Sequence, residues 1–322
     1  MINITCFAIG NLDYLNVIKI GVGTFQQYNK VPLVIYLTDN SADAFSTVIK
    51  YSNVTFKNIG DSLAADYFNK NKDLFNADFY AFSIDHIADM LMANEVLDRT
   101  IADYPESDVV VRLDMDVLFC GSMLDSVERF YNSGCVVGSS IENTPSRPQG
   151  LAQATSNFIH TNMYMNAGNM MFNCKHADLI KDHLSETFKM FKQYDIKNFN
   201  FPDQDALNLM YKDKAIYNAN PDGWLLCVAD SDDYKNCNKV IFIHYCSKNK
   251  PFNYHGGSRH VFANTYHKYL DCAYKYHCSD IFIAKIKDTI AKTTKCHNTL
   301  YKCYNLADIC KLNRVLKRLK VI

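Results

Sequence analysis

The sequence predicts an α/β fold with a mixed, mainly parallel sheet that is covered by helices on both faces. The opening of the chain alternates strand-length apolar runs with helical segments, which is the pattern of a parallel sheet. The strand segments are continuous apolar runs, as expected where both faces of a sheet are buried. A chain of 322 residues, 48% of them hydrophobic, is large enough to bury the core that such a sheet needs.

Each element is defined by an apolar segment and the polar break that ends it. The first predicted strand is rich in β-branched residues and stops at the polar turn of residues 10–13. The helix before residue 109 has apolar residues at helical spacing, including Ile87, Leu91 and Leu97. We expect buried strands at residues 2–9, 33–37, 109–113, 135–138, 163–172 and 240–245, and helices at about 14–27, 41–51, 82–101, 176–193 and 203–211.

Two regions depart from this alternation. The polar stretch from Glu142 to His160 contains two prolines and a glycine, which predicts a long loop and a candidate lid. From Phe262 onward the pattern is helical to the end of the sequence. We therefore expect a first domain of residues 1–260 and a helical, basic C-terminal extension of residues 261–322.

Charge is distributed unevenly along the chain. The formal net charge is zero, which gives no reason to expect nucleic acid as a partner. From Ile281 to the end, however, ten Lys and Arg residues stand against only Asp288 and Asp308. Such a segment either lies on an anionic membrane surface or forms the solvated face of a helix that packs on the domain.

The location expected from the sequence is the cytoplasm, with peripheral binding to the inner face of a membrane if the basic extension serves that purpose. No apolar run approaches the ~18 residues of a membrane span, and the first residues carry no basic n-region. The twelve cysteines include no C-x-x-C pair and are expected to be reduced thiols. Cys296, Cys303 and Cys310 recur every seven residues, which predicts core packing, with metal or redox chemistry as the alternative.

Two carboxylates follow the predicted strand of residues 109–113. Asp114 and Asp116 are two residues apart, so in an extended chain their side chains point the same way. In an open α/β sheet, this end of the strands is where ligands bind. Two convergent carboxylates make a hard oxygen site suited to Mn²⁺ or Mg²⁺, which can bridge a diphosphate. The alternative is a solvated turn after a strand.

A histidine and a lysine follow the predicted strand of residues 240–245. His244 is a candidate third metal ligand, and Lys250, six residues later, is a candidate contact for phosphate oxygens. Taken alone, a histidine at this position is more often a hydrogen-bonded core or surface residue than a metal ligand.

Two further segments carry small or polar groups. Asn166-Ala167-Gly168 interrupts an apolar strand, as expected where a ligand approaches the backbone closely. Residues 203–208, Asp-Gln-Asp-Ala-Leu-Asn, place carboxylates and amides at a helix start directly after Pro202. Asp203 is also suited to capping that helix, and capping is compatible with sugar binding.

Four motifs in this order and at these separations resemble the retaining glycosyltransferases of family 8, which have the Rossmann-like GT-A fold. They are the strand followed by Asp-x-Asp, then Asn-Ala-Gly, Asp-Gln-Asp-Ala-Leu-Asn, and His-Tyr-x-x-x-x-Lys-Pro-Phe. That family includes glycogenins and bacterial lipopolysaccharide galactosyl- and glucosyltransferases. The resemblance covers roughly residues 1–255. It implies transfer of a hexose, galactose or glucose favoured, from a UDP-sugar to a glycan or lipid-linked acceptor such as lipopolysaccharide.

The resemblance also implies roles for individual residues. Asp114, Asp116 and His244 would hold Mn²⁺ or Mg²⁺, which in turn holds the diphosphate. Asp203 and Gln204 are the implied catalytic residues, with Asp203 on the sugar hydroxyls and Gln204 beside the anomeric carbon. The donor-binding residues expected from the resemblance are Ala8, Ile9, Asn11, Tyr14, Asp114, Met115, Asn166, Ala167, Gly168, Asp203, Gln204 and Lys250. Asp89 is a further candidate, at a position where the family pattern is not matched.

The sequence departs from the family pattern in several places. Gly10 replaces the usual acidic residue of the first turn, and Ser247 and Phe252 replace a glycine and a tryptophan of the histidine motif. The helix before the Asp-x-Asp motif usually offers a basic residue to the donor, and none stands at residues 89–92. The substitutes we consider there are Asp85, His86 and Asp89.

The mechanism implied by the resemblance is transfer with retention of anomeric configuration. Because Gln204, not a carboxylate, matches the position beside the anomeric carbon, we favour front-face displacement, in which the leaving phosphate helps to deprotonate the acceptor hydroxyl. Double displacement through Asp203 is the alternative. Acceptor choice is expected to depend on residues 142–160 and on the segment after Phe252.

Three other functions fit parts of the pattern. A non-catalytic nucleotide-sugar-binding module would keep the pocket without turnover, but the complete set of metal ligands argues against it. A nucleotidyltransferase needs a glycine-rich phosphate loop near its first strand, whereas Gly21 and Gly23 fall within the first predicted helix. A haloacid-type phosphatase needs its Asp-x-Asp near the N-terminus with a threonine two positions on, where Leu118 stands.

Overall fold

The computed structural model of the chain describes residues 2–75, 86–141, 164–195, 199, 201–227, 240–245, 249–254 and 263–293. The chain divides into two compact units, Met1–Ser247 and Lys248–Ile322. The predicted loop of residues 142–160 and the three evenly spaced cysteines from Cys296 to Cys310 lie outside the described residues.

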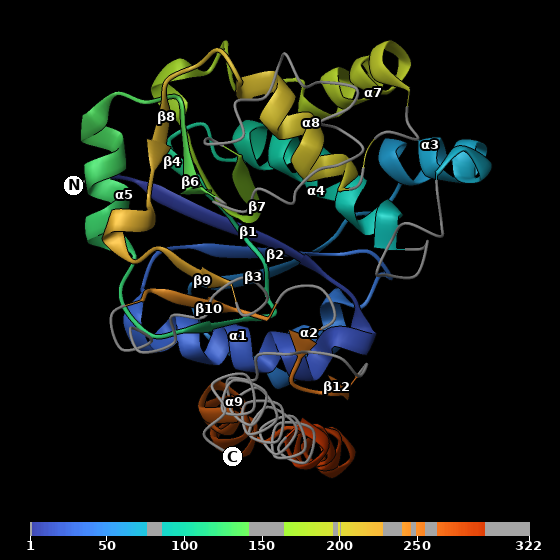
Figure 1. The fold of residues 1–322 in the computed structure, drawn as a ribbon, viewed down its shortest axis with the longest axis vertical. Helices are drawn as coiled ribbons and strands as arrows, with labels where there is room; N and C mark the ends of the chain where they lie inside the picture. The colour runs from blue at the N-terminus through green and yellow to red at the C-terminus, as the bar shows by residue number, and fades with distance from the viewer. Residues whose placement is uncertain are drawn as a thin grey trace, which may run out of the picture. The chain divides into compact units, whose positions relative to one another are not determined.

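The first unit is built around a seven-stranded sheet (Figure 1). Its strands are β1 (Ile4–Gly10), β2 (Leu33–Leu37), β3 (Val54–Asn58), β4 (Val109–Leu113), β6 (Val137–Ile141), β7 (Met165–Asn173) and β8 (Ile216–Asn218). They lie in the order β3-β2-β1-β4-β7-β6-β8. Strands β1 to β4 are parallel, β7 is antiparallel to both its neighbours, and β8 is parallel to β6. The predicted mixed, mainly parallel sheet is confirmed.

Helices cover both faces of this sheet, and a separate hydrophobic core lies on each face (Figure 1). One face is covered by α3 (Leu63–Asn71), α4 (His86–Asp103), α7 (His183–Tyr194) and α8 (Pro202–Tyr211). The other is covered by α1 (Leu15–Tyr28), α2 (Ala42–Val48) and α5 (Leu124–Ser133). Strand β4 contributes to both cores, because Val110 points to the first and Val109 and Val111 to the second. Its continuous apolar run is therefore explained by burial on two sides.

A small second sheet lies on the α1 side of the molecule. It contains β5 (Val117–Phe119), β10 (Phe242–His244) and β9 (Leu225–Cys227), in that order. The Phe119 ring packs edge-on against Phe25 of α1 at 5.2 Å and against Phe242 at 4.9 Å between ring centroids. These contacts fix the chain that follows β4 and bring β10 alongside it.

Most predicted elements are confirmed, and the missed ones are short or partly exposed. The bounds of β2 and β4 are those predicted, and the predicted helices at 14–27, 41–51, 82–101 and 203–211 correspond to α1, α2, α4 and α8. Strand β3 was missed because it is an edge strand whose residues are only partly buried. Helix α3, α5 and the three-residue β5 were also missed. The helix expected from residue 176 begins at His183, after a 3-10 turn at Cys174–His176.

The described part of the second unit contains a short hairpin and two helices. Strands β11 (Asn249–Lys250) and β12 (Asn253–Tyr254) are followed by α9 (Ala263–Lys275) and by a further helix at residues 280–293. The Phe252 ring lies 6.5 Å from Tyr269 and 5.2 Å from Phe282, between ring centroids. The expected continuous helix is interrupted, since His277 between the two helices has a φ of 53°. Within the described part of the chain, no helix is both long and apolar enough to cross a membrane.

Candidate functional site

Two carboxylates and an imidazole meet at the carboxyl end of β4. The Nε2 atom of His244 lies 3.3 Å from Asp114 Oδ2 and 3.3 Å from Asp116 Oδ1. The candidate ligand atoms of the three residues all lie within 4.8 Å of one another. The sequence predicted these three residues as one cluster, and the structure brings them together.

Strand pairing explains how residues about 130 positions apart in the sequence reach each other. Strand β10 runs antiparallel to β5, with His244 opposite Val117. The Tyr245 N–H donates to the Asp116 carbonyl oxygen at 3.1 Å. The end of β10 is thereby fastened to the Asp-x-Asp segment, and the imidazole faces the two carboxylates.

The cluster is buried on one side and accessible on the other. The His244 side chain is 7% exposed, Asp116 14% and Asp114 36%. Carboxylate oxygens with one imidazole nitrogen are ligands that suit Mn²⁺, and Mg²⁺ prefers the oxygens. The residues present therefore fit a divalent cation reached from the Asp114 side.

An irregularity in β7 forms one wall of this cluster. The pairing of β6 with β7 changes from Ser139 opposite Met170 to Ile141 opposite Met165, so β7 carries extra residues there. Asn166-Ala167-Gly168 falls within this bulge. The Gly168 carbonyl oxygen accepts from the Asp114 N–H at 2.6 Å, and the Gly168 N–H donates to Asn166 Oδ1 at 2.9 Å.

Gly168 is a glycine because no side chain fits at that position. A Cβ there would overlap the Asp114 carboxylate and lie 2.9 Å from Cε1 of His244. Sequence analysis predicted that a ligand approaches the backbone at this motif, and this stays a prediction. In the structure, the side chains that lie against Gly168 are those of Asp114 and His244.

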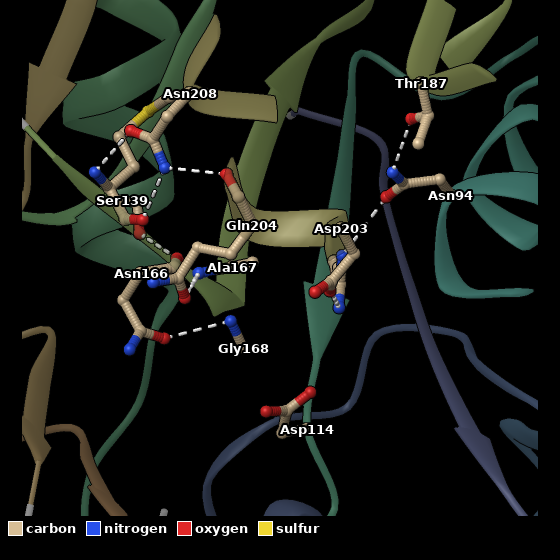
Figure 2. A network of polar contacts seen from close by, with 12 residues as sticks. Asn94, Asp114, Ser139, Asn166, Ala167, Gly168, Thr187, Asp203, Gln204 and Asn208 are labelled. Atoms are coloured by element: carbon tan, nitrogen blue, oxygen red, sulfur yellow. Dashed lines mark hydrogen bonds and ion pairs between the residues drawn. The ribbon is translucent and has the colours of Figure 1, made fainter. Parts of the chain in front are cut away.

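The start of α8 is tied to the same bulge (Figure 2). Gln204 Oε1 accepts from the Ala167 N–H at 2.9 Å. The Asn208 side chain accepts from Met165 N–H at 2.7 Å and donates to the Met165 carbonyl oxygen at 2.9 Å. The first turns of α8 are therefore held against β7 by side-chain amides.

Asp205, not Asp203, accepts a hydrogen bond from a backbone N–H group at the beginning of α8. The Asp205 carboxylate accepts from Phe201 N–H at 3.0 Å and from the Tyr164 hydroxyl at 2.5 Å. Phe201 is the N-cap residue and Pro202 the first helical residue. The capping role considered for Asp203 is therefore not observed, and its carboxylate has another partner.

That partner is Arg112, which sequence analysis did not single out. Arg112 Nη2 donates to Asp203 Oδ2 at 2.5 Å, with the two side chains 8% and 6% exposed. A signal was present in the sequence, because Arg112 is the one charged residue in the apolar run of β4. A buried charge needs a partner of opposite sign.

The residues expected to contact the nucleotide lie at the end of β1, which is the neighbour of β4 in the sheet. Asn11 Oδ1 accepts from the Tyr14 N–H at 3.3 Å and caps the 3-10 turn Leu12–Tyr14. Burial raises the pKa of Tyr14, and the negative charges of Asp89 and Asp13 raise it further. The structure thus brings Asp89, on the first turn of α4, close to Tyr14.

The other predicted donor-binding residues lie in different surroundings. Ala8 is buried in the core on the α1 side, and Ile9 is partly buried against the opposite core. The Met115 side chain is 5% exposed within the α1-side core, so its backbone is the part next to the carboxylates. Lys250 belongs to the second unit, and its contact with a diphosphate stays a prediction. Asp85 and the His86 side chain lie outside the described residues.

Comparison with known sequences gives one family. Residues 42–256 match the model of the family described as glycosyl transferase family 8, which is two thirds of the chain. No curated protein sequence matches the chain.

Solved glycosyltransferase structures share the fold. The galactosyltransferase LgtC in complex with donor and acceptor sugar analogues superposes with a TM-score of 0.58 at 18% identity, over 84% of this chain and 95% of that one. The bifunctional glycosyltransferase WbbM gives 0.57 at 16%, over 89% and 51%. Mouse xyloside xylosyltransferase 1 gives 0.50 at 13%, over 77% and 98%. At these identities the similarity establishes the fold.

Proposed function

The chain belongs to glycosyltransferase family 8, and from that premise we propose that it is a metal-dependent, retaining enzyme that transfers a hexose from a UDP-sugar to a glycan or glycolipid. The observation that carries this proposal is the cluster of Asp114, Asp116 and His244 beside the first turn of α8. It combines ligands for a divalent cation with polar groups for a sugar in one place.

The metal-binding part of the proposal assigns Asp114, Asp116 and His244 to Mn²⁺, with Mg²⁺ as the second choice. Bound there, such an ion would supply the positive charge that stabilises the leaving UDP. Asp114 is the most exposed of the three ligands, so the diphosphate is expected to approach from its side.

The sugar-binding part assigns the donor hexose to the surface formed by the β7 bulge and the start of α8. Asp203 accepts hydrogen bonds from sugar hydroxyls, and the backbone at Ala167 and Gly168 allows the ring to come close. Asn11, Tyr14 and Asp89, near the end of β1, are assigned to the nucleoside. Support for this arrangement comes from β1 and β4 being parallel neighbours whose carboxyl ends lie at the same edge of the sheet.

The proposed reaction is front-face displacement. The bond from the anomeric carbon to the β-phosphate oxygen breaks, and the acceptor oxygen bonds to that carbon on the same face. The acceptor's proton passes to an oxygen of the leaving phosphate. The alternative nucleophile, Asp203, is a poor one here because its charge is compensated by Arg112. Gln204 Oε1 is engaged with Ala167 N–H, so this residue is held in place and offers no negative charge.

Galactose and glucose are the favoured sugars, and a lipid-linked saccharide such as lipopolysaccharide is the favoured acceptor. LgtC, which shares the fold, is a galactosyltransferase solved with donor and acceptor sugar analogues. The basic segment from Ile281 onward is proposed to hold the enzyme on the cytoplasmic face of a membrane, near such an acceptor.

The test is UDP release by the purified chain from a panel of UDP-sugars, with Mn²⁺, with Mg²⁺ and with EDTA. Slow hydrolysis of the donor requires no acceptor, so the assay does not depend on knowing it. Release from one donor that stops with EDTA is the expected result and names the sugar. If no donor is hydrolysed and UDP does not bind in the presence of Mn²⁺, the proposal is wrong.

A further inference from the structure

Arg112 carries a buried charge in the middle of the molecule. It lies on β4, opposite Phe7 of β1 on one side and Met170 of β7 on the other, and only 6% of its surface is exposed. It stands two residues before Asp114, so one strand supplies both the first metal ligand and this cation.

A line of buried polar side chains fixes the Arg112 guanidinium from behind. Arg112 Nη1 donates to Asn94 Oδ1 at 3.4 Å, and Asn94 Nδ2 donates to Thr187 Oγ1 at 3.0 Å. The Thr187 hydroxyl in turn donates to the His183 carbonyl oxygen at 2.7 Å. Asn94 and Thr187 are fully buried, and Figure 2 shows both on the side of Asp203 that faces away from Asp114.

This arrangement leaves one oxygen of Asp203 for a ligand. Arg112 takes Oδ2, and within the described part of the chain no hydrogen bond involves Oδ1. A carboxylate has about four acceptor positions, so an Asp203 held by a single guanidinium can accept further hydrogen bonds from hydroxyl groups. Rotation of the Asp203 carboxylate would separate Oδ2 from the guanidinium and leave two buried charges unpaired. Because this is costly, the ion pair fixes the orientation of the carboxylate.

The helix dipole indicates that the favourable interaction of Arg112 is with the Asp203 carboxylate and not with the N-terminus of α8. Asp203 is the second residue of α8, where a negative charge is favourable and a positive charge unfavourable. Buried ion pairs are also weak contributors to stability compared with apolar side chains of similar volume. A contribution to folding alone therefore gives little reason to place an arginine at this position.

We propose that Arg112 is the positioning residue for the donor sugar, which acts by orienting Asp203 toward the sugar hydroxyls. It takes over the part of the basic residue that the family resemblance led us to expect on the helix before Asp114, where Asp89 to Met92 offer none. In this chain the positive charge is that of Arg112 on β4, and Asn94 on α4 accepts a hydrogen bond from it. The inference rests on the proposed function, because it needs a nucleotide-sugar donor.

The experiment compares the binding of UDP and of the UDP-sugar that the wild type hydrolyses, both with Mn²⁺, by isothermal titration calorimetry. The variants are Arg112→Met and Arg112→Lys. Losing the oriented carboxylate is expected to weaken the UDP-sugar by about 10- to 100-fold in Arg112→Met, while UDP affinity is unchanged. Arg112→Lys keeps the positive charge but lacks the planar guanidinium. Its affinity for the UDP-sugar is expected to lie between those of the wild type and Arg112→Met.

Three further variants separate positioning from a structural role. Asp203→Asn combined with Arg112→Met leaves no unpaired buried charge, and it is expected to bind the UDP-sugar no more weakly than Asp203→Asn alone. Arg129→Met removes an arginine from another ion pair, with Asp222, and is expected to leave the ratio of the two dissociation constants unchanged.

The outcomes distinguish this inference from the proposed function. If the wild type binds UDP and hydrolyses a donor, but Arg112→Met keeps the wild-type ratio of the two constants, the inference is overturned. Equal weakening of UDP and UDP-sugar overturns it as well, because that result indicates a purely structural role. If the wild type binds neither, the proposed function has failed, and this failure is seen before any variant is compared.

Discussion

Gly168 lies directly against two side chains of the candidate metal cluster. The Asp114 carboxylate and the His244 ring occupy the space that a Cβ at residue 168 would need. A methyl group at this position must push one of them aside, and both are candidate ligands. The requirement for glycine at residue 168 therefore concerns ligand geometry as well as backbone approach.

We expect Gly168→Ala to weaken Mn²⁺ binding by about 10- to 100-fold, the range seen when the support of a metal ligand is disturbed. Binding can be measured by the thermal shift or the calorimetric titration of Mn²⁺ in the presence of UDP. The matched control is Gly121→Ala, whose added Cβ would lie 3.9 Å from the nearest atom. Wild-type Mn²⁺ affinity in Gly168→Ala would show that the cluster is not the metal site.

Asp116→Asn and His244→Ala are expected to abolish metal-dependent UDP release while leaving the fold intact. Each removes one ligand from a cluster with an accessible side, and neither side chain belongs to the hydrophobic cores. The measurements are UDP release with Mn²⁺ and circular dichroism of the same samples. Normal release by both variants contradicts the metal assignment.

At the scale of elements, helix α1 acts as the platform for the Asp-x-Asp segment. The Met115 carbonyl oxygen, between the two carboxylates, lies against Gly21, and a Cβ on Gly21 would come within 2.8 Å of it. Alanine is favoured over glycine in a helix by about 0.8–1.0 kcal/mol. Here that gain is opposed by a contact with backbone, which cannot move aside as a flexible side chain can.

For Gly21→Ala we predict that the steric effect wins. The expected result is a lower free energy of unfolding despite the better helix former, together with weaker Mn²⁺ binding because the Asp114-Met115-Asp116 segment is displaced. Denaturant unfolding and Mn²⁺ titration measure the two effects, with Gly121→Ala as the control again. A variant more stable than the wild type with unchanged Mn²⁺ affinity would show that α1 shifts to absorb the methyl group.

Helix α7 is capped by a residue from a different helix. The Asp98 carboxylate on α4 accepts from the backbone N–H groups of His183 and Leu184, at 3.0 and 3.1 Å, and from the ring of His183 at 2.6 Å. The local cap residue, Asp182, makes no capping bond with its own side chain. Asp98 therefore joins α4 to the start of α7, on the side of the sheet that holds Arg112 and Asn94.

Asp98→Ala is expected to lower the free energy of unfolding by about 1–2 kcal/mol, the usual cost of a lost helix cap. Asp178→Ala, whose side chain is 96% exposed, is the control and is expected to change stability by less than about 0.5 kcal/mol. Urea unfolding of the three proteins makes the comparison. Equal stability of Asp98→Ala and the wild type would contradict the capping role.

At the scale of the whole molecule, the predictable features were those encoded in short segments of sequence. Strands such as β4 are continuous apolar runs, and the candidate metal cluster consists of recognisable residues at strand ends. The start of α7 was misplaced because its cap, Asp98, is 85 positions away, and no local pattern reveals it. The Arg112–Asp203 pair was missed for the same reason, since burial of both charges depends on α8 packing against β4 and β7.

The distribution of charge along the whole chain is uneven, with a basic segment at the C-terminal end and an acidic remainder. The ten basic and two acidic residues from Ile281 onward give a net +8, so residues 1–280, with 24 basic and 32 acidic residues, carry −8. A sequence with an overall charge of zero thus has a strongly basic end. Each basic residue near an anionic bilayer contributes about 1 kcal/mol, and this attraction is screened by salt.

We therefore expect the full chain to sediment with vesicles that contain phosphatidylglycerol, not with pure phosphatidylcholine, and to be released by high salt. Reversing Lys317, Arg318 and Lys320 to glutamate should abolish sedimentation, because six units of charge are lost from the basic segment. The control reverses three exposed lysines of the first unit, Lys70, Lys181 and Lys189, and should sediment nearly as the wild type does. Equal loss in both triple variants would indicate a general charge effect. No sedimentation of the wild type would favour the other interpretation, in which the basic residues are the solvated face of a helix packed on the protein.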